Sequence, residues 1–164
     1  MKEPTANSDR DSAEARLQQF IDKFAPDIAD LIRSVRKALR RRLPGAIELV
    51  YDNYNFFVIG YGPNERASEA VLSIAAQAKG VSICFIQGAK LPDPTRLLIG
   101  SGKQTRNLRI QSADVLLRDL GGVANRLNRK ALLFAAPAQI VAERRFPVVP
   151  HISFQAFTRS YHKG

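Results

Sequence analysis

Cysteine, tryptophan and histidine are scarce in this sequence, which limits the chemistry it can support. The chain has one cysteine, two histidines and no tryptophan. A single cysteine, Cys84, excludes an internal disulfide framework and is typical of the reducing cytosol, so we expect a cytoplasmic protein. Cys84 lies in an apolar segment, where we expect an inert thiol. His151 and His162 belong to no H-E-x-x-H motif and no Cys/His cluster. The sequence therefore predicts no metal site and no cofactor.

Long apolar runs are also missing. No run approaches the ~20 residues that a helix needs to cross a bilayer. The polar start of the chain, with its mixed charges, lacks the apolar core of a secretory signal. We therefore expect no membrane partner. Of the 164 residues, 45% are hydrophobic and 24% are charged, a composition typical of one soluble domain with a real core.

Acidic residues are outnumbered by basic ones. The chain has 15 Asp and Glu against 25 Lys and Arg, a formal net charge of +10. Much of the excess lies in residues 89–130, which hold nine basic and three acidic residues. Such a field attracts anions, nucleic acid included. Residues 89–130 contain no Phe, Tyr or Trp, however, and this lack of stacking groups counts against nucleic acid.

The first part of the chain reads as helical. We expect a disordered leader over residues 1–11 and a helix over 12–24, followed by a second helix from Pro26 to about Arg42. Most basic residues of the second helix lie off its apolar stripe. They are Arg33, Arg36, Lys37, Arg40 and Arg41. This cationic face could grip phosphates, or it could simply keep the helix soluble.

The middle of the chain reads as strands. Apolar segments at 47–51, 55–61, 70–76 and 81–87 are separated by short turn signals, and such links favour antiparallel hairpins. A short helix over 94–99 would be capped by Asp93. A fifth strand would cover 103–110 and a final helix 122–136. The predicted fold is α+β, an antiparallel sheet of about five strands with N-terminal and C-terminal helices packed on it. Residues 137–164 would be an edge strand, a docked arm or a flexible tail.

The segment "IGSGKQTRNLRI" resembles a phosphate-binding loop at first sight. The pattern G-x-x-x-x-G-K-[ST] would need glycine at Leu97 and Ser or Thr at Gln104, and an extended segment follows in place of a helix. We therefore interpret the segment as a turn that leads into a basic strand. Lys103 and Arg109 would face water or a ligand, with Arg106 at the rim of the buried face.

Two longer segments carry a family resemblance. They are "YDNYNFFVIGYGPNERASEAVLSIA" and "VSICFIQGAKLPDPTRLLIGSGKQTRNLRI". Over about residues 15–136 the chain resembles the YdhG-like family of small bacterial cytosolic proteins of unknown function. The resemblance implies a compact α+β domain, which we place at residues 12–136. The family often has a basic residue in place of Gln104 and a histidine in place of Asn107. Some relatives are labelled iron chaperones, but the few carboxylates here offer little to a hard cation.

The expected function is binding without catalysis. We expect a site for a small anionic ligand or a protein partner. Its candidate residues are Lys103, Arg106, Arg109, Arg96, Tyr51 and Asn53. Alternatives are nucleic-acid binding by the basic 96–109 surface, an enzyme of unknown reaction, and iron delivery.

Two features near the first strand stay open at this stage. The residues Tyr51 and Asn53 could shape a turn or line a pocket. An enzyme could pair Glu48 with a cation, although an acid beside a turn is usually solvated. The sequence leaves the oligomeric state open.

Overall fold

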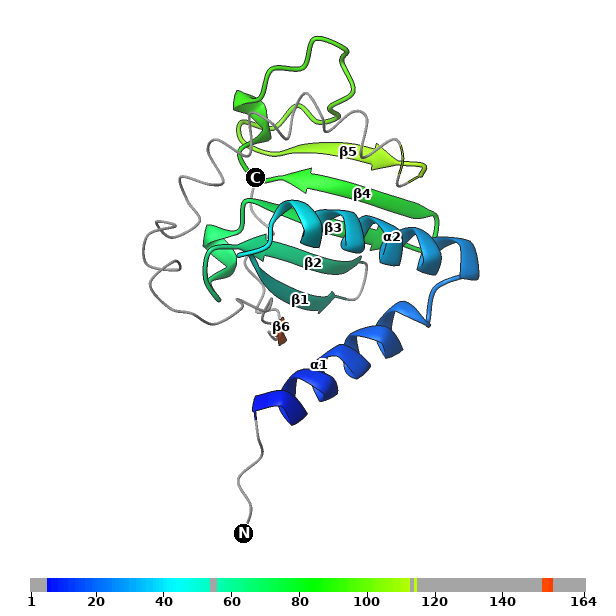
Figure 1. Ribbon diagram of the computed structural model, residues 1–164. Coiled ribbons are helices and arrows are strands. Elements are labelled where there is room, and N and C mark those ends of the chain that lie inside the picture. The colour runs from blue at the N-terminus through cyan, green and yellow to red at the C-terminus, as the bar shows by residue number, and fades with distance from the viewer. Residues whose placement is uncertain (1–5, 54–55, 113, 115–151, 155–164) are drawn as a thin grey trace.

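Two helices precede a β-sheet in the chain order (Figure 1). The computed structural model describes residues 6–53, 56–112, 114 and 152–154. Helix α1 spans Ala6–Ile21 and helix α2 spans Pro26–Arg42. Proline at the start of α2 suits a first turn, because that turn has no intrahelical partner for a backbone N–H.

The sheet has six strands in the order β5-β4-β3-β2-β1-β6. Their bounds are Ile47–Asn53 (β1), Phe56–Gly62 (β2), Leu72–Gln77 (β3), Gly80–Phe85 (β4), Arg106–Ile110 (β5) and Ile152–Phe154 (β6). Strands β1 to β5 pair antiparallel, each with the next along the chain. Strand β6 pairs in parallel with β1. The predicted α+β class, with about five antiparallel strands, is confirmed.

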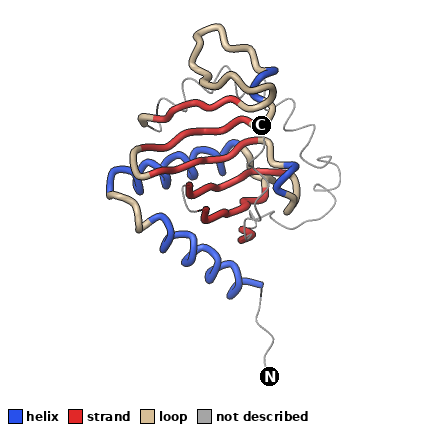
Figure 2. The backbone as a smooth tube through the Cα atoms, turned by 180° about the vertical axis from the view of Figure 1, so that it is seen from behind, coloured by secondary structure: helices blue, strands red, loops and turns tan. Residues whose placement is uncertain are grey.

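Helix α2 lies across one face of the sheet and packs on β3 and β4 (Figures 1 and 2). The strands turn alternate residues to this face, so Ile59, Ile74 and Ile83 meet the buried side of α2 in the core. Aromatic contacts fix the end of helix α1 and the turn that follows it. Phe20 and Phe24 lie 6.0 and 5.9 Å from the ring of Phe57 on β2, measured between ring centroids.

The first helix starts earlier than the sequence predicts. It already covers residues 6–11, which we expected to be a leader, and it ends at Ile21 rather than at 24. No proline or glycine interrupts residues 6–21, and alanine and glutamate favour helix, so nothing in the segment stops it. Among the described residues, no helix combines the length and the apolar character needed to cross a membrane.

The predicted helix at 94–99 is wrong. Asp93 does act as a cap, since its carboxylate accepts the backbone N–H groups of Leu97 and Leu98 at 2.9 Å each. Arg96, however, has a left-handed φ of 53°, which ends the turn before a helix can form. Two single-turn 3₁₀ helices occur elsewhere, η1 at Ala67–Glu69 and η2 at Gly88–Lys90.

The fifth strand starts at Arg106 rather than at Lys103. Gly100, with a φ of 127°, turns the chain, and the Gln104 carbonyl accepts the N–H of Ala89 in η2. Residues 106–110 therefore form a strand, as predicted, whereas residues 102–104 form a bend. The helix expected at 122–136 and most of the 137–164 extension lie outside the described residues.

Candidate functional site

Arg36 is buried although it is charged. It lies on the sheet-facing side of α2 and is 5% exposed. Its guanidinium donates to both carboxylate oxygens of Glu48 on β1, with Nε 3.0 Å from Oε1 and Nη2 2.7 Å from Oε2. Glu48 is 0% exposed. This two-point contact compensates both charges where water is excluded.

A second carboxylate, Glu14 on α1, binds the same guanidinium. Arg36 Nη1 and Nη2 donate to Glu14 Oε1 and Oε2 at 2.6 and 2.7 Å, and Gln18 donates to Oε1 at 2.9 Å. The hydrogen bond from Arg36 is the main cause that lowers the pKa of Glu14 to about 2, although burial opposes it. Glu14 is therefore ionised at neutral pH and ties α1 to α2.

Tyr61 on β2 also belongs to this contact. It stands opposite Glu48 in the β1–β2 register and donates its hydroxyl to Glu48 Oε1 at 3.0 Å. Burial, with the neighbouring Glu48 carboxylate, raises the pKa of Tyr61 well above its ordinary value. For Arg36, burial acts to lower the pKa, but the hydrogen bonds to Glu14 and Glu48 outweigh it and raise the pKa. We call Glu14, Arg36, Glu48 and Tyr61 the charged junction.

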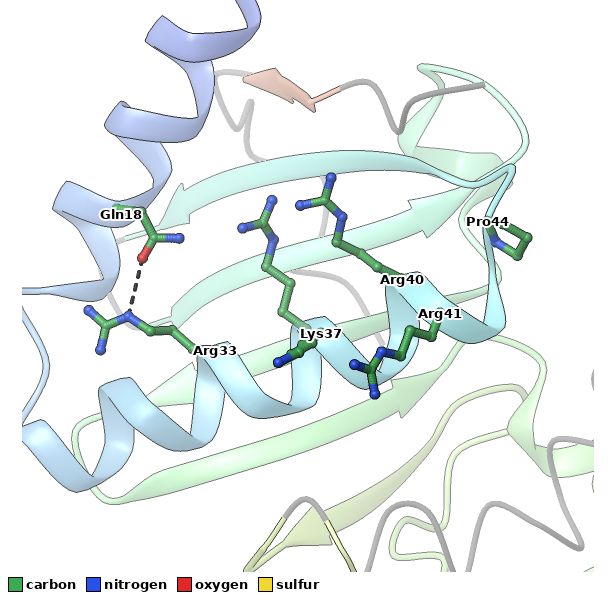
Figure 3. Close-up of a pocket in the computed structure, with 7 residues that line it drawn as sticks. Gln18, Arg33, Lys37, Arg40, Arg41 and Pro44 are labelled. Atoms are coloured by element: carbon green, nitrogen blue, oxygen red, sulfur yellow. Dashed lines mark hydrogen bonds between the residues drawn. The ribbon is translucent and has the colours of Figure 1, made fainter. Parts of the chain in front are cut away.

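A cleft of about 500 Å³ lies beside the charged junction (Figure 3). We call it the arginine cleft. Its lining residues are Gln18, Arg33, Arg36, Lys37, Arg40, Arg41 and Pro44. Gln18 comes from α1, while the five cations come from α2, where residues three and four apart share a face. The aliphatic stems of these long side chains form much of its wall.

Besides Arg36, two further cations of the arginine cleft contact acidic residues of α1, of α2 or of the connection between them. Arg33 donates to Asp30 at 3.0 Å and to Gln18 at 3.2 Å, and it also contacts Asp22. Arg40 lies 3.6 Å from a carboxylate oxygen of Glu14, which already binds Arg36. The charge of Arg33 is therefore balanced by Asp22 and Asp30, whereas Arg40 shares the carboxylate of Glu14 with Arg36.

Lys37 and Arg41 are different, because neither forms an ion pair with any residue that the structure describes. Both are exposed, and they extend to the same side of the helix in Figure 3. Like charges four residues apart on a helix destabilise it by roughly 0.2–0.5 kcal/mol. The arginine cleft therefore carries adjacent, uncompensated positive charge.

The strand cations of the sequence-based site face opposite sides of the sheet. Arg106 belongs to the helix-facing row and donates to the backbone oxygens of Gly102 and Thr105, at 2.5 and 2.8 Å. Arg109 lies on the other face, exposed, with Nη2 3.4 Å from the oxygen of Lys79. Arg106 thus braces the turn before β5, and the two guanidinium groups do not share one surface.

The remaining candidates are spread over the molecule. Tyr51, buried on β1, lies in the same register row as Arg109, but four strand spacings away, about 19 Å. Asn53 ends β1 opposite Phe56. Arg96 and Lys103 are exposed in the connection before β5. The structure does not bring Tyr51 together with the β5 cations.

The sequence analysis missed the charged junction. Its expectations that Glu48 is solvated and that Arg36 lies off the apolar stripe are both wrong, because Glu48 is fully buried and Arg36 is buried too. Two signals were available. Glu48 shares a strand face with Val50, and Arg36 stands at helical spacing between Ile32 and Leu39, within the buried stripe. An acid and a base that both interrupt an apolar face are candidates for a buried pair.

Metal and thiol chemistry find no support in the described part of the chain. No group of three or more His, Cys, Asp or Glu side chains is placed there to hold a metal ion. Cys84 on β4 is half-buried, and burial raises its pKa, partly offset by a hydrogen bond with Ser73. A raised pKa keeps the sulfur as a thiol, the less reactive form.

Fold and site together define an α+β domain with a cationic cleft that is lined mainly by α1 and α2. Comparison of the chain with protein-family models, with curated proteins and with solved structures finds no match.

Proposed function

We propose that the protein binds a small anionic ligand in the arginine cleft. The observation that carries the proposal is the adjacent pair Lys37 and Arg41, exposed without a described counter-charge in a cleft that also holds Arg40. A bound anion would relieve the repulsion between these cations. It would also receive charge-assisted hydrogen bonds, and a guanidinium can grip a carboxylate or a phosphate at two points.

The charged junction supports this function by holding together the two helices that line the cleft, and it contributes Arg36 to the lining. Arg36 is satisfied by Glu14 and Glu48, so its role is to fix α1 against α2 rather than to take the ligand. Gln18 from α1 and the cations of α2 can then face one space.

The lining favours binding over catalysis. The cleft, within the described residues, is lined by cations, a glutamine and a proline, with no hydroxyl, thiol or imidazole group. Cations and an amide can hold and orient an anion, and among these lining residues only Lys37 is of a type that also serves as a general base or nucleophile. The sequence-based expectations of nucleic-acid binding, iron delivery and membership of the YdhG-like family stay predictions.

The test is a thermal-shift and calorimetric titration with sodium phosphate, sodium sulfate and trisodium citrate. A ligand of the folded state raises the midpoint of unfolding as its concentration exceeds its Kd. We expect at least one of these anions to bind, and the double variant K37Q/R41Q to weaken its binding at least tenfold.

A matched control separates the cleft from the connection before β5. The double variant R96Q/K103Q removes the same two charges from exposed positions of the sequence-based site, so both variants lower the net charge equally. We expect R96Q/K103Q to bind like the wild type. Equal weakening in both variants, or no binding of any of the three anions, would overturn the proposal.

A further inference from the structure

The arginine cleft is much larger than the single anionic group that would balance the charges of Lys37 and Arg41. Its volume is about 500 Å³, within the range of pockets that hold whole organic ligands. From Arg33 to Arg41 it follows α2 over eight residue steps of ~1.5 Å each, about 12 Å along the axis. One phosphate or carboxylate group would occupy only part of this length.

The two ends of the cleft differ in charge. Figure 3 shows Gln18 and Arg33 at one end, joined by a hydrogen bond, and Arg41 with Pro44 toward the other. At the Gln18 end the charge of Arg33 is matched by Asp22 and Asp30. The uncompensated charge is at Lys37 and Arg41. A ligand that fits is therefore anionic at one end and neutral at the other.

The Gln18 end can receive hydroxyl groups. Gln18 uses one amide hydrogen toward Glu14 and accepts one hydrogen bond from Arg33. A side-chain amide has two N–H donors and two acceptor positions, so one of each remains. These suit a hydroxyl, which both donates and accepts.

The anionic end favours a phosphomonoester over a carboxylate. A carboxylate has one charge and two oxygens. A phosphomonoester carries close to two charges at pH 7 and presents three acceptor oxygens. Two adjacent cations, Lys37 and Arg41, match a dianion, and their combined N–H donors exceed what two oxygens accept.

We infer that the ligand of the arginine cleft is an organic phosphomonoester whose hydroxyl-bearing part lies toward Gln18 and whose dianionic phosphate lies on Lys37 and Arg41. This inference rests on the proposed function and makes it more specific. The inference predicts that the organic part of the ligand adds affinity. It also predicts that the phosphate binds as a dianion, because that form matches the charge of the two cations.

The experiment compares matched probes by calorimetry at pH 7.5. Glycerol 3-phosphate, glucose 6-phosphate and adenosine monophosphate are titrated beside inorganic phosphate and glucuronate, which offers a carboxylate on a sugar. We expect at least one ester to bind tenfold more tightly than both inorganic phosphate and glucuronate. The uncharged variant Q18M removes the amide at similar side-chain length and adds no charge beside Glu14. It should weaken that ester at least fivefold while changing inorganic phosphate less than twofold.

A pH series tests the dianion. The second pKa of a phosphomonoester is near 6, so the dianionic fraction, and with it the affinity, should fall about tenfold from pH 7.5 to pH 5. The charged groups that face Lys37 and Arg41 within the described residues are Arg33, Arg36 and Arg40 of α2 and Glu14 of α1. Arginine stays protonated throughout this range, and Glu14, with a pKa of about 2, stays ionised.

Sulfate serves as the pH control, since it remains a dianion from pH 7.5 to pH 5. If the affinity for sulfate falls with pH as much as the affinity for the ester, the pH effect comes from the protein. That result would overturn the claim that the phosphate must be a dianion. Esters that bind no better than inorganic phosphate or glucuronate would overturn the inference while leaving anion binding in the cleft intact. Loss of all anion binding would remove the proposed function and the inference with it.

Discussion

Arg36 and Glu48 form a two-point ion pair that is closed off from water between α2 and β1, with N–O distances of 3.0 and 2.7 Å. They are twelve residues apart in the chain, and their contact crosses the interface between helix and sheet. Removing two charges from water costs several kcal/mol per ion, so such a pair is tolerated only when the geometry is good. Here Tyr61 and Glu14 supply the remaining hydrogen bonds.

Removing only one partner of this pair should be costly. We expect Arg36→Met to lower the free energy of unfolding by about 3–5 kcal/mol, because Glu48 is left as an uncompensated buried charge. The double variant R36M/E48Q removes both charges and keeps an oxygen that can accept from Tyr61, so it should recover at least about 2 kcal/mol. Urea unfolding at pH 7 measures both. A double variant as unstable as the single one would contradict this account.

Glu14 should give the fold a distinct response to acid. Its pKa is lowered in the folded protein from 4.5 to about 2. A lowered pKa means that its stabilisation is fully present above pH 4.5 and is lost as the pH falls through 2. We expect Glu14→Gln to cost about 1–2 kcal/mol at pH 7, less than the full linkage value, because the side chain is 39% exposed and solvent screens the pair. Unfolding curves of both proteins should converge toward pH 2. A constant difference from pH 7 to pH 2 would refute the role of the Glu14 charge.

The general fold could be predicted from the sequence because its signals are local. Apolar spacing marked the second helix, and turn residues such as Gly62 and Gly80 marked strand ends. The short links then required an antiparallel order. The parallel pairing of β6 with β1 has no local signal, because it depends on residues about 100 positions apart.

The charged junction and the arginine cleft could not be derived in the same way. Periodicity shows which face of α2 is apolar, but not that α1 supplies Glu14 and Gln18 to it. The basic motif that leads into and includes β5 drew attention because its residues are close in sequence. Strand alternation then places Arg106 and Arg109 on opposite faces.

Gly88 should tolerate no side chain. A Cβ at this position would lie 2.6 Å from the Cβ of Arg106 and 2.8 Å from its backbone nitrogen. We expect Gly88→Ala to cost about 1–3 kcal/mol, the usual range for an overpacked site. Gly102, in the double-glycine turn, has nothing within 4 Å of such a Cβ, so Gly102→Ala is the matched control and should change stability by less than about 0.5 kcal/mol. Similar unfolding midpoints for the two variants would contradict the close approach of η2 and β5.

Arg106 and Arg109 should contribute differently to stability although both are cations of one strand. Arg106 donates two hydrogen bonds to the turn before β5, to Gly102 and Thr105. A net hydrogen bond contributes about 0.5–1.5 kcal/mol, so Arg106→Ala should cost about 1–2 kcal/mol. Arg109 makes one long contact, 3.4 Å to the oxygen of Lys79, on an exposed face, and Arg109→Ala should cost less than about 0.5 kcal/mol. Because each variant removes one positive charge, a purely electrostatic effect would move both unfolding midpoints equally. If the two variants shift the midpoint of urea unfolding equally, the loss of positive charge explains the effect. The hydrogen bonds of Arg106 to the turn would then not set the stability of this edge of the sheet.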